Sequence, residues 1–441
     1  MNPRAAHREW LGQPEEWLVF GFLLVILLGA ALLALPAAAR DGHSIGLFDG
    51  LFTAASAVCV TGLVAVDTGT TFAPFGQLVL LALIQVGGLG FMVFATMILV
   101  MLGRKISIKG RMLIRESMNG SSLTDLGRLT RLYLALALGI ELVGAGMLAI
   151  RFVPLYGVKK GLWYALFHAV SAFCNAGFDL FGGFSSLTAY ARDPLVLLTV
   201  GVLIVLGGLG FSVILETLRN RQGFRAMSLH ARIVLTFTPA LIIAGTLFFM
   251  LAERMDALNA LFQSVTMRTA GFNTVDLSAM KDGSKLFSGM LMAVGASPAS
   301  TGGGMKTTTV AVVAMLILSV VKGDSEVNAA RRRLSGDTVR RALVVVALFL
   351  TTLMLGTLSV TLIEDGRFTL ADILFECASA MGTVGVSSIG TPNLTAASRA
   401  VLIPMMFLGR VGPLTLAVAV ARRQGRYRVP SKYPEEKIMI G

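Results

Sequence analysis

Long apolar runs recur throughout this chain and set the first limit on its fold. Each run of about 20 residues is long enough to cross roughly 30 Å of hydrocarbon as a helix. Only 14% of the 441 residues are charged and the mean hydropathy is +0.76, which leaves too few charges to cover a soluble protein of this size. The sequence therefore predicts an all-α, polytopic membrane protein. The first run is followed by many others, so we interpret it as a retained span and not a cleaved signal.

The connections between the apolar runs alternate in charge, which predicts the orientation of the chain. Eight spans are predicted, at residues 17–39, 77–102, 129–153, 194–218, 231–252, 286–321, 340–363 and 398–421. The two termini and the basic loops on their side hold 25 of the 38 Lys and Arg residues, against 11 on the opposite side. Because basic loops stay in the cytoplasm, the N-terminus (1–16) and the C-terminal tail (422–441) are both predicted to be cytoplasmic. The same rule explains the net charge of +13 without a nucleic acid partner.

Several function classes find no support in the sequence. The three cysteines have no metal-binding spacing, and the four histidines are scattered with no hydrolytic set beside them. The stretch "GASPASTGGGMKTTT" is rich in glycine and contains Lys306 followed by threonine, as a P-loop does. A P-loop, however, requires glycine directly before the lysine, and Met305 stands there. We therefore expect no nucleotide on this chain and no enzymatic activity.

An internal repeat organises the chain into four units. Four stretches of 11 residues align without gaps and each ends in a glycine: "FTAASAVCVTG", "FHAVSAFCNAG", "LFQSVTMRTAG" and "FECASAMGTVG", ending at Gly62, Gly177, Gly271 and Gly385. The apolar part of each is too short to cross a bilayer, which is typical of a re-entrant half-helix. A second set of glycines follows, at Gly87, Gly207, Gly302 and Gly409. The repeats of span, pore helix and span are predicted at 17–102, 129–218, 231–321 and 340–421.

The glycine that ends each stretch belongs to a short loop that suits a cation. Non-helical backbone at membrane depth is tolerated where it lines a cavity or is buried in protein, and a ring of carbonyls can replace the water shell of a monovalent cation. Four such loops can surround one central pore with pseudo-fourfold symmetry. We expect the backbone carbonyls of these loops to bind K⁺: Val60, Thr61, Gly62, Asn175, Ala176, Gly177, Thr269, Ala270, Gly271, Thr383, Val384 and Gly385.

These four loops, together with a broken sixth span, resemble the Trk/Ktr/HKT superfamily of cation transporters over nearly the whole chain, about 17–441. The likeness is greatest to the membrane subunits of Ktr potassium uptake systems. Eight spans without an extra N-terminal pair, a short chain and the ending "YPEEKIMIG" favour them over the longer TrkH-like subunits. The resemblance implies K⁺ uptake across the bacterial plasma (inner) membrane through a gated, channel-like filter, stimulated by Na⁺.

The same resemblance implies partners. It implies a homodimer in which each chain has its own pore. It also implies a cytosolic KtrA-type regulatory ring that binds nucleotides (ATP/ADP). Surrounding membrane lipid is the remaining expected contact, and no nucleic acid is expected.

Polar residues interrupt the predicted sixth span at 296–309, in the second helix of the third repeat. The three adjacent glycines can take conformations closed to other residues, and nearby hydroxyls can satisfy freed backbone groups. We expect a mobile gate beneath the filter, formed by Ala299, Ser300, Thr301, Gly302, Gly303, Gly304 and Lys306, together with Arg410 of the eighth span. The third repeat is expected to be the one that departs from its siblings.

Two charges at membrane depth allow more than one interpretation. Arg410 in "FLGRVGP" is either a snorkelling side chain or a positive charge below the filter that limits cation occupancy, and the family resemblance implies the second. Lys306 is either an ammonium at a helix boundary or part of the gate.

Two rival functions remain open from the sequence. A Na⁺-coupled secondary active transporter with alternating access also uses broken helices at the midplane, although two large repeats are more usual for it. A passive membrane scaffold for a cytosolic ring would have no use for four filter-like loops.

Overall fold

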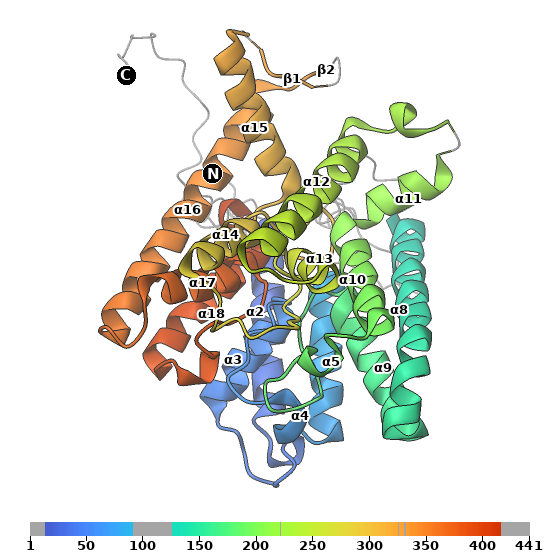
Figure 1. Cartoon of the computed structure of the whole chain (residues 1–441), viewed down its shortest axis with the longest axis vertical. Coiled ribbons are helices and arrows are strands. Elements are labelled where there is room, and N and C mark those ends of the chain that lie inside the picture. The colour runs from blue at the N-terminus through green and yellow to red at the C-terminus, as the bar shows by residue number, and fades with distance from the viewer. Residues whose placement is uncertain (1–13, 91–125, 221, 325, 330–331, 416–441) are drawn as a thin grey trace, which may run out of the picture.

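The computed structural model describes residues 14–90, 126–220, 222–324, 326–329 and 332–415. Residues 1–13, the end of the predicted second span (91–102), the basic loop 103–116 and the tail 422–441 lie outside the described residues. The chain is largely helical, with a single short antiparallel pair of strands among the described residues, β1 (Asn328–Ala329) and β2 (Arg332–Arg333). Together with the end of α15, this pair protrudes at one end of the molecule (Figure 1).

The helices are grouped here by the residue ranges of the four predicted repeats, which stay a prediction. The first repeat contains α2 (Pro14–Leu33), α3 (Leu47–Val58), α4 (Thr68–Thr71) and α5 (Pro74–Leu89). The second contains α8 (Leu126–Tyr156), α9 (Val158–Phe173), α10 (Pro194–Leu209) and α11 (Phe211–Arg219). The third contains α12 (Leu229–Ala252), α13 (Ala257–Thr266), α14 (Asp282–Ala293) and α15 (Thr307–Lys322). The fourth contains α16 (Gly336–Glu364), α17 (Leu370–Gly382) and α18 (Ala396–Val411).

Three single helices among the described residues are long and apolar enough to cross a membrane: Thr130–Tyr156, Leu229–Ala252 and Gly336–Glu364. A fourth candidate joins α10 and α11, which meet at an angle of 96°. Many leucines on these helices are exposed, as expected of surfaces that contact lipid. The count of eight spans stays a prediction.

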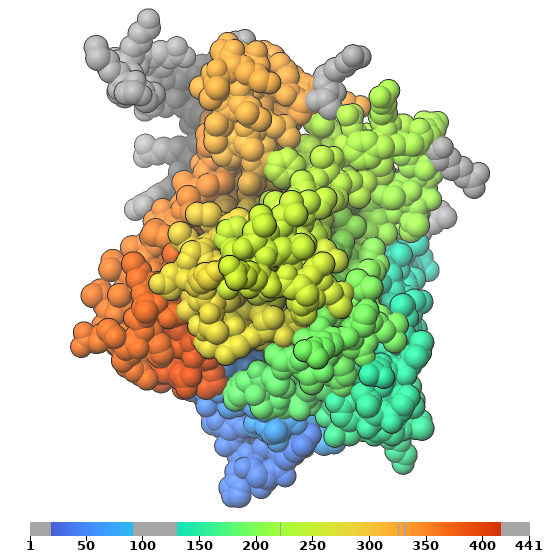
Figure 2. All heavy atoms as spheres, in the orientation of Figure 1, coloured from blue at the N-terminus to red at the C-terminus, as the bar shows by residue number. Residues whose placement is uncertain are grey.

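The four repeats are arranged as a closed ring. The second helix of each repeat packs on the short helix of the next: α5 on α9, α10 on α13, α14 on α17, and α18 back on α3. The space-filling view shows the third repeat, in yellow-green and yellow, between the teal and green second repeat and the orange fourth repeat (Figure 2). We call α3, α9, α13 and α17 the pre-loop helices.

A polar contact occurs at each junction of this ring. Gln77 accepts a hydrogen bond from Trp163 at 2.8 Å, and Asn259 donates to the Ala191 carbonyl at 3.0 Å. Lys285 pairs with Asp372 at 2.8 Å, and Arg399 pairs with Asp49 at 2.7 Å. Because each contact involves the first part of a pre-loop helix, each of these helices is tied to the repeat before it.

The second helices differ from the prediction in one respect. Contrary to the prediction, the third repeat is not alone in having an interrupted second helix, because α10 and α18 are interrupted at Gly210 and Gly412; α5 ends at Gly90, the last described residue of its segment. These glycines share φ values of +85 to +93° and ψ values of 131 to 136°. That conformation is open to glycine and interrupts the helical hydrogen-bond ladder.

The break in the third repeat is also shifted and longer. It runs from 294 to 306 and not from 296 to 309, since Thr307 already begins α15. Val294 and Met305 form an isolated parallel β-bridge that closes the two ends of this stretch. We call residues 294–306 the connecting segment.

Candidate functional site

Each pre-loop helix leads into a glycine loop (60–62, 175–177, 269–271 and 383–385), and three of the four end in the same tight reversal. In three repeats the residue before the glycine donates its backbone N–H to the carbonyl five residues earlier, each at 2.8 Å, from Thr61, Ala176 and Val384. All four loop glycines have positive φ, between 70 and 95°. Val60, Asn175 and Thr383 also adopt the left-handed conformation, but Thr269 does not. The third loop therefore has a different backbone path from the other three.

The four glycine loops meet one another in cyclic order. A Cβ on Gly62 would lie 2.5 Å from the Ala176 carbonyl oxygen, and one on Gly177 would lie 2.7 Å from that of Ala270. A Cβ on Gly271 or Gly385 would overlap the corresponding carbonyl oxygen of the fourth or the first loop. Each glycine thus lies against the backbone of the next repeat, and no side chain fits there. The predicted carbonyl-bearing residues are brought together, and all but Gly385 are buried.

Hydroxyl groups on the pre-loop helices hold the loops in place. Ser56 and Ser379 accept hydrogen bonds from the N–H groups of Gly62 and Gly385, each at 3.0 Å. In the second repeat Ser171 donates to the Phe178 carbonyl at 2.8 Å. In the third, where valine occupies this position, the neighbouring Thr266 donates to the Phe272 carbonyl at 2.5 Å. In the sequence, these contacts are indicated by a hydroxylated residue at the fifth position of the 11-residue stretch in three repeats.

The second set of glycines gives close approach within a repeat. A Cβ on Gly87, Gly207 or Gly409 would overlap the carbonyl oxygen at the end of the pre-loop helix in the same repeat, at Val58, Phe173 or Met381. Gly302, which the sequence aligns with them, instead lies near Ala296 and the loop residues Asn175 and Thr269. Gly302 therefore lies beside the second and third glycine loops and not at the end of its own pre-loop helix.

The connecting segment is hydrogen-bonded to the second helices of two other repeats. Thr301 donates its N–H to the Gly207 carbonyl at 3.1 Å and its hydroxyl to the Phe173 carbonyl at 2.8 Å. The Ala299 carbonyl accepts from the N–H of Phe211 at 3.1 Å. On the opposite side, Gly304 donates to the Gly409 carbonyl at 3.1 Å. The segment thus spans from the second repeat to the fourth.

The other predicted gate residues lie in or beside this segment. Ser300 donates its hydroxyl to the Ser297 carbonyl at 2.6 Å, which stabilises the turn. Gly303 lies beside the side chain of Thr383 in the fourth glycine loop. Lys306 donates to the Gly302 carbonyl at 2.8 Å and so closes the segment on itself.

Arg410 connects the connecting segment to a third repeat. Its guanidinium donates to the carbonyls of Thr301, Gly87 and Gly88, the last at 3.0 Å. The side chain is half-buried, and its acceptors are carbonyls at the end of α5 and in the connecting segment. Because it is held by backbone on the inner side of α18, the arrangement does not fit a side chain that snorkels to the membrane surface.

Arg268 is a charged residue that the sequence reasoning assigned to the outer, weakly charged side. The structure buries it beside the third glycine loop, with 7% of its surface exposed. It donates to the Gly295 carbonyl at 3.4 Å, at the beginning of the connecting segment. The available signal was its position inside the repeat, three residues before Gly271, where the other repeats have cysteine or glycine.

No group of three or more His, Cys, Asp or Glu side chains in the described ranges is arranged to hold a metal ion. Backbone carbonyls, hydroxyls and the amide oxygen of Asn175 are the oxygen atoms that the glycine loops offer. Such neutral oxygens suit a weakly hydrated monovalent cation that must be released again.

The sequence profile of TrkH, described as a cation transport protein, matches residues 25–240 and 229–428. The chain is 40% identical to Ktr system potassium uptake protein B of Bacillus subtilis over 440 residues, covering 97% of each chain. It is 38% identical to the protein of that name from Vibrio alginolyticus, covering 98% of this chain and 95% of the other. It is 36% identical to potassium/sodium uptake protein NtpJ of Enterococcus hirae, covering 97% of each.

The fold is similar to that of a solved structure. The crystal structure of the potassium transporter TrkH from Vibrio parahaemolyticus superimposes with a TM-score of 0.70 and 17% sequence identity. The match covers 93% of this chain and 86% of that one. The helical fold expected from the sequence is therefore confirmed at the level of architecture.

Proposed function

The chain belongs to the Trk/Ktr family of cation transport proteins, and from this premise we propose that it takes up K⁺ through a gated, channel-like filter. Membership makes the chain a multi-pass membrane protein and a transporter. The curated relatives at 36 to 40% identity are named for potassium uptake. K⁺ is the cargo that these names and the oxygen chemistry of the loops support together.

The observation that carries the proposal is the closed ring of glycine loops. The four loops meet through their backbones, with one side-chain hydrogen bond between Asn175 and Thr269, and none of their residues carries a charged side chain. Carbonyl dipoles compensate for the hydration shell of K⁺. Since the third loop follows a different backbone path and Thr269 is not left-handed, the four loops of the ring are not equivalent. We therefore propose looser selection among K⁺, Rb⁺ and Na⁺ than a ring of four identical loops would give.

The connecting segment supports the gating part of the proposal. It contacts the glycine loops and is held on both sides by backbone carbonyls and by Arg410. These contacts are numerous but individually modest, since a hydrogen bond contributes about 1 kcal/mol net. A partner that pulls on the cytoplasmic side could therefore release the segment without unfolding the helices around it.

The remaining parts of the proposal concern ions and partners. We propose a homodimer in the bacterial inner membrane, with both termini cytoplasmic, Na⁺ stimulation and control by a cytosolic KtrA-type ring that binds ATP/ADP. Sequence identity of 40% to the B. subtilis protein, against 17% to the TrkH structure, favours a Ktr-type over a TrkH-type partner.

One alternative has an observation in its favour, because the E. hirae relative is named a potassium/sodium uptake protein. The chain could accordingly be a Na⁺-coupled active transporter. Uptake of K⁺ and Na⁺ should be measured in a host that lacks its own K⁺ uptake, with and without Na⁺ and the cytosolic ring. K⁺ flux that persists at zero Na⁺ and follows the membrane potential supports the gated filter. A fixed ratio of Na⁺ to K⁺, with no flux when either is absent, overturns it.

A further inference from the structure

We propose that Glu376 and His168 are positioning residues that hold the outgoing ends of the fourth and second glycine loops and thereby set cation selectivity. The inference rests on the proposed function, because selectivity has meaning only if the loops conduct cations. Both residues are fully buried and neither belongs to the glycine loops or the connecting segment.

The two residues occupy the same place in the repeat. Each lies nine residues before its loop glycine, which is Gly385 in one case and Gly177 in the other. That place is on the pre-loop helix, about one and a half turns before its last residue. A side chain there can reach the chain as it leaves the glycine loop and turns toward the next helix.

Glu376 binds two residues of the chain that follows the fourth glycine loop; we call the chain that follows each glycine loop its outgoing segment. Its two carboxylate oxygens accept hydrogen bonds from the hydroxyl groups of Ser387 at 2.6 Å and Thr391 at 2.7 Å. Ser387 in turn accepts from the N–H of Gly390 at 2.8 Å. The carboxylate therefore fixes a turn that begins two residues after Gly385.

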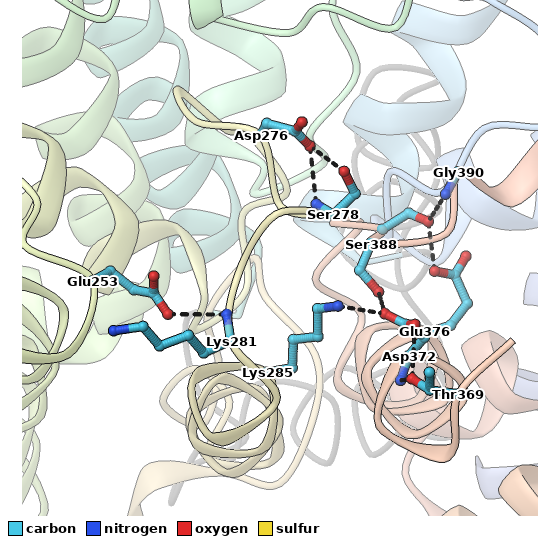
Figure 3. A network of polar contacts seen from close by, with 11 residues as sticks. Glu253, Asp276, Ser278, Lys281, Lys285, Thr369, Asp372, Glu376, Ser388 and Gly390 are labelled. Carbon is cyan, nitrogen blue, oxygen red and sulfur yellow. Dashed lines mark hydrogen bonds and ion pairs between the residues drawn. The ribbon is translucent and has the colours of Figure 1, made fainter.

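A second carboxylate one helical turn earlier fixes the same segment. Asp372 accepts from the hydroxyl of Ser388 at 2.9 Å and pairs with Lys285 of α14. Figure 3 shows Lys285 extending toward Asp372, with Ser388 on the same carboxylate and Glu376 farther along α17. Lys285 neutralises Asp372, whereas Glu376 has hydroxyl partners alone among the described residues, and short O–H···O⁻ bonds are its compensation.

His168 performs the equivalent task in the second repeat with one bond. Its Nε2 accepts from the N–H of Leu180 at 3.3 Å, and its Nδ1 lies 2.6 Å from the Tyr164 carbonyl. The second contact assigns the proton to Nδ1 and leaves Nε2 as the acceptor. The ring also stacks on Phe181, with centroids 4.3 Å apart.

The other two repeats lack this support. Thr53 stands at the equivalent position in the first repeat, and its buried hydroxyl has no hydrogen-bond partner in the described structure. Phe262 stands there in the third and is apolar. Two of the four outgoing segments are thus held from behind by a polar side chain, and two are not.

The test compares the ratio of K⁺ to Na⁺ uptake in vesicles that contain the full chain. Glu376→Leu removes both acceptors at similar size, Glu376→Gln keeps an acceptor, and Thr53→Val is the matched control. We expect the ratio to fall about tenfold in E376L, the change that 1.4 kcal/mol of lost discrimination produces. It should change by less than about twofold in T53V, and E376Q should recover most of the loss. His168→Leu should lower the ratio as E376L does.

Poor folding cannot imitate this result, because fewer folded molecules lower both uptakes and leave their ratio unchanged. If E376L does not reach the membrane, Thr391→Val removes one of the two bonds and should lower the ratio by a smaller amount. An unchanged ratio in E376L, or in T391V where E376L is missing, overturns the inference. So does an equal effect of T53V. A wild-type chain that transports neither ion, with or without the cytosolic ring, would overturn the proposed function itself.

Discussion

Replacing Arg410 by alanine should release the connecting segment. The guanidinium binds three carbonyls, one in the connecting segment and two at the end of α5. A hydrogen bond from a charged group contributes about 1.5–3 kcal/mol. Loss of the bond to Thr301 alone should therefore shift the equilibrium between the held and released segment by about 10- to 150-fold.

The assay is the initial rate of Rb⁺ uptake into proteoliposomes that contain the chain without any cytosolic ring. We expect Arg410→Ala to raise this partner-independent rate at least about tenfold. Arg410→Lys separates anchoring from charge, because lysine keeps the charge but lacks the planar fork that binds several carbonyls. If anchoring dominates, R410K should give an intermediate rate, and if charge alone matters, it should behave as the wild type.

Arg399→Ala is the matched control, since Arg399 lies on the same helix and pairs with Asp49 at its outer end. Its loss should lower stability slightly without raising the partner-free rate. A folded R410A protein whose rate without the ring equals that of the wild type would refute the reasoning.

Three further outcomes are expected. Gly385→Ala should lower cation uptake by more than about tenfold, because a non-glycine residue at positive φ costs about 1–2 kcal/mol before any overlap with the first loop. The control is Gly283→Ala, at a site with no atom within 4 Å. Equal uptake by the two variants would contradict this prediction. Deletion of 299–304 should give higher flux that no longer responds to the ring, and a folded deletion that is still regulated would count against a gate. Hydrogen bonds from Asn259 hold the pKa of Asp256, in the connection before α13, below its ordinary value. The stabilisation is therefore present above pH 4 and is lost as pH falls through the lowered pKa. Asp256→Asn should accordingly make the decrease of the unfolding temperature at acid pH less steep, which thermal-unfolding curves at several pH values would measure.

The meeting of the four glycine loops could be predicted because these loops have a strong sequence signal. The glycines at the ends of the four aligned stretches all lie in one ring, and the hydroxylated position before them holds the loop in three repeats. In the third repeat the exception, Val265, was visible in the sequence, and its neighbour Thr266 supplies the bond. Local backbone demands leave such traces because few residue types satisfy them.

Other features could not be read from the sequence. Gly90, Gly210 and Gly412 look like ordinary small residues within apolar runs, because the positive φ of a glycine leaves no pattern in the residue types around it. The burial of Arg268 was missed because a charge count assigns a residue to a side of the membrane and not to a place in the protein. Contacts between repeats, such as those of Arg410, depend on tertiary geometry that spacing does not encode.

The four glycine loops are supported by different residues, and this affects how cation preference can change through mutation. In a ring of four identical chains every substitution is applied four times at once. Here Thr53, His168, Phe262 and Glu376 are separate codons, so a single mutation alters one quadrant and leaves three as they were. Cation preference can therefore shift in small mutational steps, each of which keeps most of the carbonyl ring in working order.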